Sequence, residues 1–193
     1  MKNILVIFDC FGVLCDKVFS TLIPTYVSED KCREIDENIV GPAEVGEMTR
    51  DEYHEKLSEA LDISVDEIIN AVEKLTVPHS DLYPVIEKIK DFADVALLSN
   101  AYEGHAERIL KRFNIEHLFD RIFLSYKCKL VKPDKGFYLH CVNSFGKKYD
   151  AVYMVDDTEK NLVPLSDIGI TPIKYTGVES VTKALNGYFD YPL

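Results

Sequence analysis

Residues 1–15 have the sequence MKNILVIFDCFGVLC, in which the apolar residues 4–8 run directly into Asp9. A short apolar run bounded by polar residues is typical of a strand that is buried on both faces of a parallel sheet. The lysine and the apolar run resemble a signal peptide, but Asp9 interrupts the run and no small-residue cleavage site follows. We therefore predict that residues 4–8 form a buried first strand and that Asp9 stands at its end.

Further short apolar runs recur along the chain and alternate with helical patterns. In one of these patterns Ala106, Ile109, Leu110 and Phe113 share a face. Alternating strands and helices predict an α/β fold with a Rossmann-like, doubly wound parallel sheet that helices cover on both faces. The further predicted strands are residues 95–98, 122–124, 151–155 and, more weakly, 172–175.

The spacing of the predicted strands changes between the first and the second. Roughly 80 residues lie between them, where a usual βαβ unit needs about 30. This segment has a helical pattern, and Thr49 with Glu52 and Ser64 with Glu67 each form a possible capping box. We predict a small helical cap inserted after the first strand. The predicted division is a core domain of residues 1–15 and 81–193 and a cap domain of residues 16–80.

The composition argues against several classes of partner. Among 193 residues, 22 are basic and 33 acidic, and the resulting net charge of -11 would repel nucleic acid and anionic membranes. The five cysteines form no CxxC pair, so neither a disulfide framework nor a zinc site is indicated. No stretch approaches the roughly 18 apolar residues that span a bilayer. We expect a cytoplasmic protein that acts on a small molecule, with neither nucleic acid nor membrane as partner; the oligomeric state stays open.

Polar side chains follow the predicted strands at the edge where ligands bind in open parallel sheets, outside the carboxyl ends of the strands. Carboxylates suit a hard cation such as Mg²⁺, while a lysine and a hydroxyl suit the oxygens of a phosphoryl group. The candidate site residues are Asp9 after the first strand, Ser99 and Asn100 after the second, Lys132 after the third, and Asp156 with Asp157 after the fourth.

Four segments carry a resemblance to a known family. They are VIFDCFGVL at 6–14, VALLSNA at 95–101, LVKPDKGFY at 130–138 and YMVDDTEKN at 153–161. The sequence resembles the haloacid dehalogenase (HAD) superfamily, whose four motifs these segments match in order. Each motif alone is commonplace, but four in the right order at the right strand ends are specific.

A narrower resemblance comes from three longer segments, GEMTRDEY at 46–53, SNAYEGHAE at 99–107 and VDDTEKNLVPLSDIGI at 155–170. They look like subfamily IA, and within it like the phosphatases related to the N-terminal domain of soluble epoxide hydrolase and to bacterial sugar-1-phosphate phosphatases. Because the long insertion precedes the second motif, the resemblance implies a helical cap placed after the first motif.

The resemblance implies a hydrolase of phosphorylated small molecules. Asp9 would attack phosphorus and form an aspartyl-phosphate, which water then hydrolyses. Ser99, with Asn100 and the backbone amides beside it, would bind phosphate oxygens. Lys132 would bind the phosphate too and neutralise charge between it and the nucleophile. The implied catalytic residues are therefore Asp9, Ser99 and Lys132.

The same resemblance implies Mg²⁺ as cofactor. Its protein ligands would be the carboxylates of Asp9 and Asp157 and the backbone carbonyl of Phe11. Asp156 would act directly or through a water molecule, and waters would fill the remaining positions of an octahedral shell.

Phe11 departs from the usual pattern. Phosphatases of this superfamily generally carry a second aspartate at this position, which serves as general acid and base and contributes about 10²- to 10⁴-fold to the rate. Its loss favours good leaving groups, such as sugar 1-phosphates or acyl phosphates, and the related sugar-1-phosphate phosphatases also lack it. Among the histidines, His105 is the candidate for a substitute acid.

Two other functions stay open. Haloacid dehalogenases carry an aromatic residue where this chain has Phe11, so Asp9 could be the nucleophile of a 2-haloacid dehalogenase. Asp156 with Asp157 argues against this, since dehalogenases need no Mg²⁺ and two adjacent carboxylates would repel each other without a cation. The other function is that of a degenerate enzyme that binds a phosphorylated ligand or a partner protein without turnover.

Overall fold

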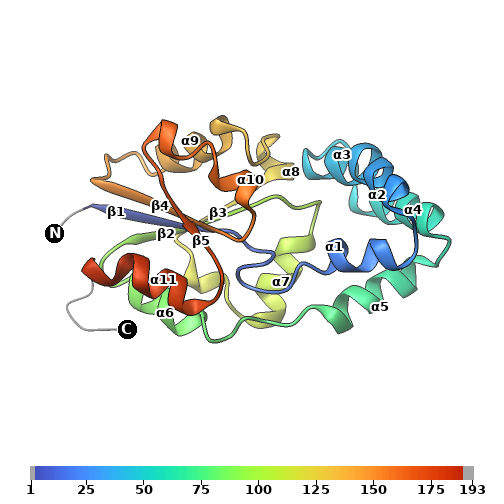
Figure 1. Ribbon diagram of the computed structural model, residues 1–193, viewed down its shortest axis with the longest axis horizontal. Helices are drawn as coiled ribbons and strands as arrows, with labels where there is room; N and C mark the ends of the chain where they lie inside the picture. Colours follow the sequence, from blue (N-terminus) through green and yellow to red (C-terminus); the bar gives the residue numbers. More distant parts are fainter. Residues whose placement is uncertain (1–2, 189–193) are drawn as a thin grey trace.

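The computed structural model describes residues 3–188 and contains a five-stranded, all-parallel sheet between helices (Figure 1). The strand order is β3-β2-β1-β4-β5, so β1 lies in the middle, and all of its residues are buried. The predicted α/β fold is confirmed, and the predicted strands differ from the observed ones only at their ends. The strands are β1 (Ile4–Phe8), β2 (Asp94–Ser99), β3 (Arg121–Leu124), β4 (Ala151–Asp156) and β5 (Thr171–Lys174).

Alternate residues of β1 belong to two different cores, as expected for a strand whose side chains point to opposite faces. Val6 and Phe8 pack in one core with residues of α6, α7 and α11, while Leu5 and Ile7 pack in the other with residues of α9 and α10. The helical layers have the bounds α6 (Tyr83–Ile89), α7 (His105–Phe113), η3 (Glu116–Leu118), α8 (Ser125–Cys128), α9 (Lys135–Ser144), α10 (Glu159–Leu162), η4 (Ser166–Ile168), α11 (Val178–Leu185) and η5 (Asn186–Tyr188).

The predicted face of α7 is the buried one. Ala106, Ile109 and Leu110 are almost completely buried against the sheet, and Phe113 packs at the edge of the same core. Gly104 and Asn114, at the two ends of this helix, both have positive φ, so the chain turns sharply before and after it. Because β2 ends at Ser99 and α7 begins at His105, the start of the helix lies close to the carboxyl end of this strand.

The segment between β1 and α6 is helical, as predicted, and has a hydrophobic cluster of its own. Both predicted capping boxes are present: Thr49 and Glu52 exchange hydrogen bonds at the start of α4, and Ser64 and Glu67 do the same at the start of α5. Its helices are α1 (Val18–Leu22), η1 (Ile23–Thr25), α2 (Glu29–Ile35), the π-helical η2 (Asp36–Val40), α3 (Gly41–Glu44), α4 (Arg50–Leu61) and α5 (Val65–Leu75).

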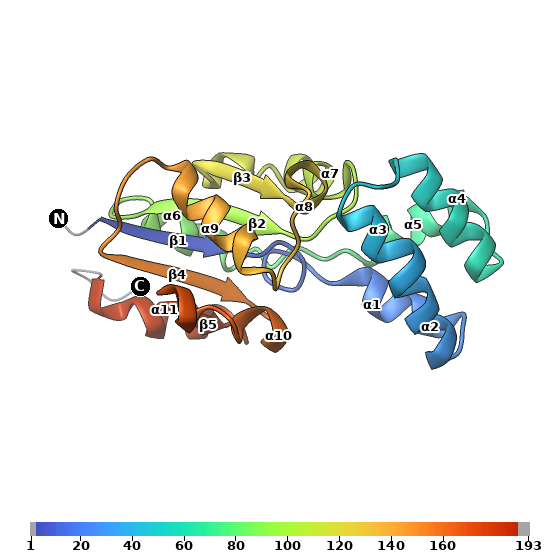
Figure 2. The ribbon, with the colours of Figure 1, turned by 90° about the horizontal axis from the view of Figure 1, so that it is seen from above.

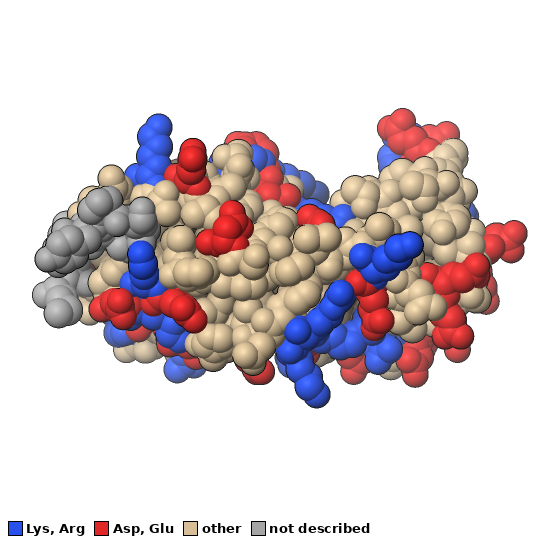
Figure 3. Space-filling view, turned by 90° about the horizontal axis from the view of Figure 1, so that it is seen from below, with Lys and Arg blue, Asp and Glu red and all other residues tan. Residues whose placement is uncertain are grey.

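The helical insertion lies beyond the carboxyl edge of the sheet, where the strand arrows end (Figure 2). Tyr102, from the loop after β2, is buried in the hydrophobic cluster of the insertion and so joins it to the rest of the molecule. On the face shown in Figure 3, acidic side chains gather over the insertion and basic ones are interspersed with them toward the sheet. Within residues 3–188, no helix has both the length and the apolar character to cross a membrane.

Candidate active site

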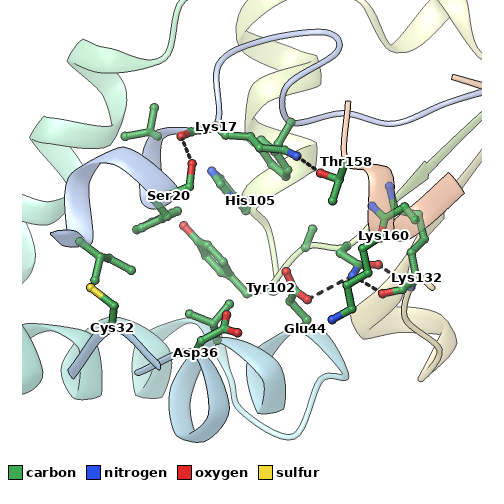
Figure 4. A pocket seen from close by; sticks show the side chains of 18 of the residues that line it. Lys17, Ser20, Cys32, Asp36, Glu44, Tyr102, His105, Lys132, Thr158 and Lys160 are labelled. Atoms are coloured by element: carbon green, nitrogen blue, oxygen red, sulfur yellow. Dashed lines mark hydrogen bonds between the residues drawn. The ribbon is translucent and has the colours of Figure 1, made fainter. Parts of the chain in front are cut away.

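A cavity of about 630 Å³ lies between the carboxyl edge of the sheet and the helical insertion (Figure 4). The sheet side of its lining includes Asp9, Asn100 and Lys132, which follow three different strands. The insertion side includes Glu44 of α3 and Tyr53 of α4. The fold thus brings Asp9, Asn100 and Lys132, three of the residues predicted at the strand ends, to one cavity.

Lys132 lies between two buried carboxylates beside this cavity. Its ammonium nitrogen is 2.8 Å from Asp9 Oδ1 and 2.7 Å from Asp156 Oδ2. Asp156 also accepts hydrogen bonds from the Asn161 amide at 3.1 and 3.0 Å and from the Thr158 backbone N–H at 2.7 Å. A buried ion pair is tolerated when such hydrogen bonds satisfy the remaining lone pairs. Asp156 therefore has the surroundings of a fixed structural anion.

The Asp9 carboxylate has one occupied and one open oxygen. Lys132 and the Cys10 backbone N–H, at 2.7 Å, both donate to Oδ1. Among residues 3–188, no donor binds Oδ2. An ionised carboxylate that is held through one oxygen keeps the other available as a nucleophile.

Burial and pairing set the pKa values of these groups. Burial raises the pKa of Asp9, and the Lys132 ammonium opposes that rise. Burial also disfavours charge on Asp156, but Lys132 and the donors from Thr158 and Asn161 hold its pKa below the usual range. Burial works against the charge of Lys132, yet the two carboxylates raise its pKa above the ordinary value. Lys132 is therefore a fixed cation at neutral pH.

Asp157 pairs with Lys17, which no pattern in the sequence marks as a site residue. Lys17 Nζ lies 2.5 Å from Asp157 Oδ1 and 2.5 Å from Thr158 Oγ1. Lysines offset the repulsion between the two adjacent carboxylates, since Lys17 pairs with Asp157 and Lys132 pairs with Asp156 as well as with Asp9. Lys17 precedes α1, so this ion pair also joins the start of the insertion to the end of β4.

Ser99 and Asn100 occupy different environments at the end of β2. Ser99 is completely buried, donates to the Asn100 carbonyl at 3.3 Å, and is not among the described residues that line the cavity. The Asn100 side chain accepts from the Lys132 N–H at 2.8 Å and donates to the Lys132 carbonyl at 3.1 Å. It also donates to Glu44 Oε2 at 3.3 Å. Asn100 thus holds the loop of Lys132 in place and contacts the insertion.

Oxygen ligands for a cation gather at the ends of β1 and β4. Carboxylate oxygens of Asp9, Asp156 and Asp157 lie within 4.8 Å of one another. Gly12, in the loop that also contains the Phe11 carbonyl, permits this approach: its φ is +88°, and a Cβ there would lie 2.5 Å from the Asp157 carboxyl. Carboxylate and carbonyl oxygens are the ligands that Mg²⁺ prefers. These residues therefore fit a magnesium ion.

Comparison with known families identifies the chain. The profile of the haloacid dehalogenase-like hydrolases matches residues 5–169. The chain belongs to this family of hydrolases. A curated relative of this HAD-like hydrolase is drimenol cyclase from Aspergillus calidoustus, which is 25% identical over 163 residues. The match covers 80% of the chain but only 30% of that relative.

Solved structures share the fold of this HAD-like hydrolase. A HAD family enzyme from Bacteroides thetaiotaomicron is 23% identical, with a TM-score of 0.77 over 96% of this chain and 98% of that one. The same enzyme has been solved in complex with magnesium and inorganic phosphate. L-2-haloacid dehalogenase from Xanthobacter autotrophicus is 16% identical, with a TM-score of 0.65 over 100% of this chain and 85% of that one. At these identities the likeness concerns the fold.

In this HAD-like hydrolase, Phe11 begins a row of stacked rings along the cavity. The ring centroids of Phe11 and His105 are 4.3 Å apart, those of His105 and Tyr102 4.6 Å, and those of Tyr102 and Tyr53 4.2 Å. The interplanar angles are 19°, 17° and 25°. Phe11 therefore packs against the first residue of α7, and the row continues through Tyr102, in the loop after β2, into the insertion.

His105 does not have the properties of a substitute acid. Burial lowers its pKa to about 3, and the charges of Arg108 and His54 add to this effect. A general acid works best with a pKa near the operating pH. The imidazole of His105 is neutral near pH 7 and has no imidazolium proton to donate. The interpretation of His105 as the acid is therefore not supported.

His105→Phe is expected to make folding stability less sensitive to acid. The folded-state pKa of about 3 lies below the ordinary value of 6.5, so as the pH falls through this window the unfolded chain binds a proton that the folded protein rejects. At pH 4.5 this costs the wild type roughly 2 to 3 kcal/mol relative to pH 7. Urea unfolding at both pH values measures the difference. Exposed His117→Gln is the control, and an unchanged pH dependence in His105→Phe would contradict this account.

Proposed function

We propose that this protein is a magnesium-dependent phosphohydrolase that acts on small phosphorylated molecules, with Asp9 as the nucleophile. The observation that carries the proposal is the buried ion pair between Asp9 and Lys132, 2.8 Å apart, at the edge of the cavity. The Lys132 ammonium opposes the effect of burial, which raises the pKa of Asp9 to about 7, and so favours the ionised form of the nucleophile. It also provides a fixed positive charge where the anionic oxygens of a phosphate would bind.

The reaction would proceed in two steps. In the first, Asp9 attacks phosphorus through its open Oδ2 while the ester oxygen leaves, and an aspartyl-phosphate forms. In the second, water attacks the same phosphorus and releases inorganic phosphate. Lys132 faces the reacting oxygens in both steps and stabilises the negative charge that they gain. Asn100 would hold the backbone of Lys132 and help to orient the phosphate, and the buried Ser99, which donates to the Asn100 carbonyl, would support Asn100.

We propose Asp9, Asp157 and the carbonyl of Phe11 as the protein ligands of the metal. Mg²⁺, when bound, would neutralise negative charge on the phosphate and polarise it for attack. Asp156 would contribute through a water molecule, because its oxygens already accept from Lys132 and other protein donors. Lys17, now paired with Asp157, would have to give way to the cation.

We also propose residues 16–80 as a cap that covers the site and selects the substrate. Several of its residues line the same cavity as Asp9, among them Glu44 and Tyr53. Phe11 offers no proton to a leaving group, which favours substrates that leave readily, such as sugar 1-phosphates. A magnesium and phosphate complex of the related Bacteroides enzyme is in keeping with this chemistry.

A 2-haloacid dehalogenase is the second candidate, and two observations favour it. Lys132 and Lys17 already neutralise the acidic pair, so this arrangement of charges is tolerable without a metal. Phe11 also leaves an apolar surface next to Asp9, where the displacement of halide needs no acid. The two candidates differ in their need for magnesium.

Removal of magnesium is the test of the proposed function. We expect phosphate release from a panel that contains a sugar 1-phosphate, an alkyl phosphate and 4-nitrophenyl phosphate. EDTA should lower turnover by at least about 10²-fold, since several kcal/mol of charge stabilisation are lost, and added Mg²⁺ should restore it. Chloride release from 2-chloropropionate in the presence of EDTA would replace the proposal with dehalogenation. Binding of Mg²⁺ and phosphate without any turnover would indicate a ligand-binding protein.

A further inference from the structure

We propose that Glu44 is the proton donor to the leaving group, in place of the carboxylate that position 11 lacks. This inference rests on the proposed function, because it assigns the missing acid of the same reaction. Glu44 comes from the helical insertion and belongs to none of the four family motifs.

Glu44 of α3 and Lys132 line the same cavity, which Asp9 also lines (Figure 4). Its Oε2 is 3.3 Å from the amide nitrogen of Asn100, which donates at 3.1 Å to the carbonyl of Lys132. Lys132 in turn binds Asp9 at 2.8 Å. These contacts connect the insertion to the nucleophile through two side chains. A phosphate bound at Asp9 would have its ester oxygen on the side of the insertion, where Glu44 is.

The surroundings of Glu44 favour its acid form. Burial raises its pKa to about 7, and the negative charges of Asp36 and Asp9 act in the same direction. Lys132 and the hydrogen bond from Asn100 oppose the rise. A substantial fraction of Glu44 is therefore protonated near neutral pH, and a bound phosphate dianion would increase this fraction.

Three other lysines lie near α3 or line the cavity. In α8, which packs against α3, Lys127 pairs with Glu107 at 2.8 Å. Lys129, next to α8, donates to the carbonyl of Gly46. Lys160 lines the cavity but is exposed to solvent. The charge of Lys132 lowers the pKa of Glu44, but Lys132 is shared with two carboxylates.

The proton balance of the reaction closes with Glu44. As Asp9 forms its bond to phosphorus, the bond from phosphorus to the ester oxygen breaks, and Glu44 gives its proton to that oxygen. In the second step, water attacks phosphorus, the bond from phosphorus to Asp9 breaks, and the Glu44 carboxylate takes the proton from water. Glu44 returns to its acid form, and one alcohol and one phosphate are released.

Glu44→Gln tests this role because glutamine keeps the shape and the contact with Asn100 but has no acidic proton. We expect kcat/KM for an alkyl phosphate to fall by about 10²-fold or more, and kcat/KM for 4-nitrophenyl phosphate to fall only a few-fold. Across a series of aryl phosphates, the variant should depend more steeply on the pKa of the leaving group. In the wild type we expect kcat/KM for the alkyl phosphate to decrease in alkali as Glu44 loses its proton, and this decrease should be absent from the variant.

Glu47→Gln is the matched control, because Glu47 is exposed, lies three positions away and is not among the described lining residues. Activity on 4-nitrophenyl phosphate shows that Glu44→Gln is folded. An equal loss for all leaving groups, or no loss, would overturn the assignment of Glu44 and leave the proposed function in place. A wild type that releases no phosphate from any ester would overturn both.

Discussion

Asp9→Asn is expected to reduce phosphate release by about 10⁴-fold or more at saturating substrate, which is the scale on which removal of a nucleophile acts. Asparagine has nearly the same shape and can accept from the Cys10 N–H, but its amide does not attack phosphorus. Its effect should be just as large on 4-nitrophenyl phosphate, because the nucleophile is needed whatever group leaves. The measurement is kcat for both an alkyl and an aryl phosphate.

Two comparisons make the Asp9→Asn result specific. The exposed Asp91→Asn variant loses a carboxylate outside the cavity and should keep the activity of the wild type. Stability should change little in Asp9→Asn, since Lys132 still pairs with Asp156. Turnover that persists in Asp9→Asn would remove Asp9 from the role of nucleophile.

Lys132→Met is expected to lower the free energy of unfolding by about 3 to 5 kcal/mol at pH 7, besides its loss of activity. The reason is that Asp9 and Asp156 then stay buried beside each other without the cation that neutralises them. Methionine fills a similar volume, so the cost comes from charge rather than from a cavity. Urea unfolding of the variant and the wild type gives the difference.

The pH dependence separates this electrostatic cause from poor packing. Without Lys132, the pKa values of Asp9 and Asp156 rise, and protonation in acid removes the repulsion between them. The stability difference between Lys132→Met and the wild type should therefore shrink as the pH falls, and a constant difference would point to packing. Lys135→Met, which breaks the exposed pair with Asp167, is the control and should cost less than about 1 kcal/mol.

Lys17 and Lys132 differ in how easily a metal ion could displace them from their carboxylates. Lys132 is buried between its carboxylates, whereas Lys17 is about a third exposed, so only the pair with Asp157 can open at little cost. Lys17 also begins the insertion. A cation at Asp157 would therefore release a contact between the insertion and the end of β4, which connects metal binding to the position of the proposed cap.

The periodic parts of the fold were predictable from sequence. The strands at β1, β2 and β4 are apolar runs that end in polar residues, and the capping boxes of α4 and α5 lie within four residues each. These signals are local, because burial of a strand and capping of a helix depend on neighbours in the chain. The strand ends also predicted Asp9, Asn100 and Lys132 at one edge, since parallel strands place their carboxyl ends together.

The sequence by itself thus determined the parallel sheet, the family and the residues at its carboxyl edge. Only the tertiary structure decided which charges are paired, namely Lys17 with Asp157 and Lys132 with Asp156. It also decided that Glu44 lines the cavity. Lys17 and Thr158, which share a hydrogen bond, are 141 positions apart. Such pairs carry no periodic signal. They depend on how the helical insertion packs onto the sheet, and Coulomb energies change with each ångström and with burial.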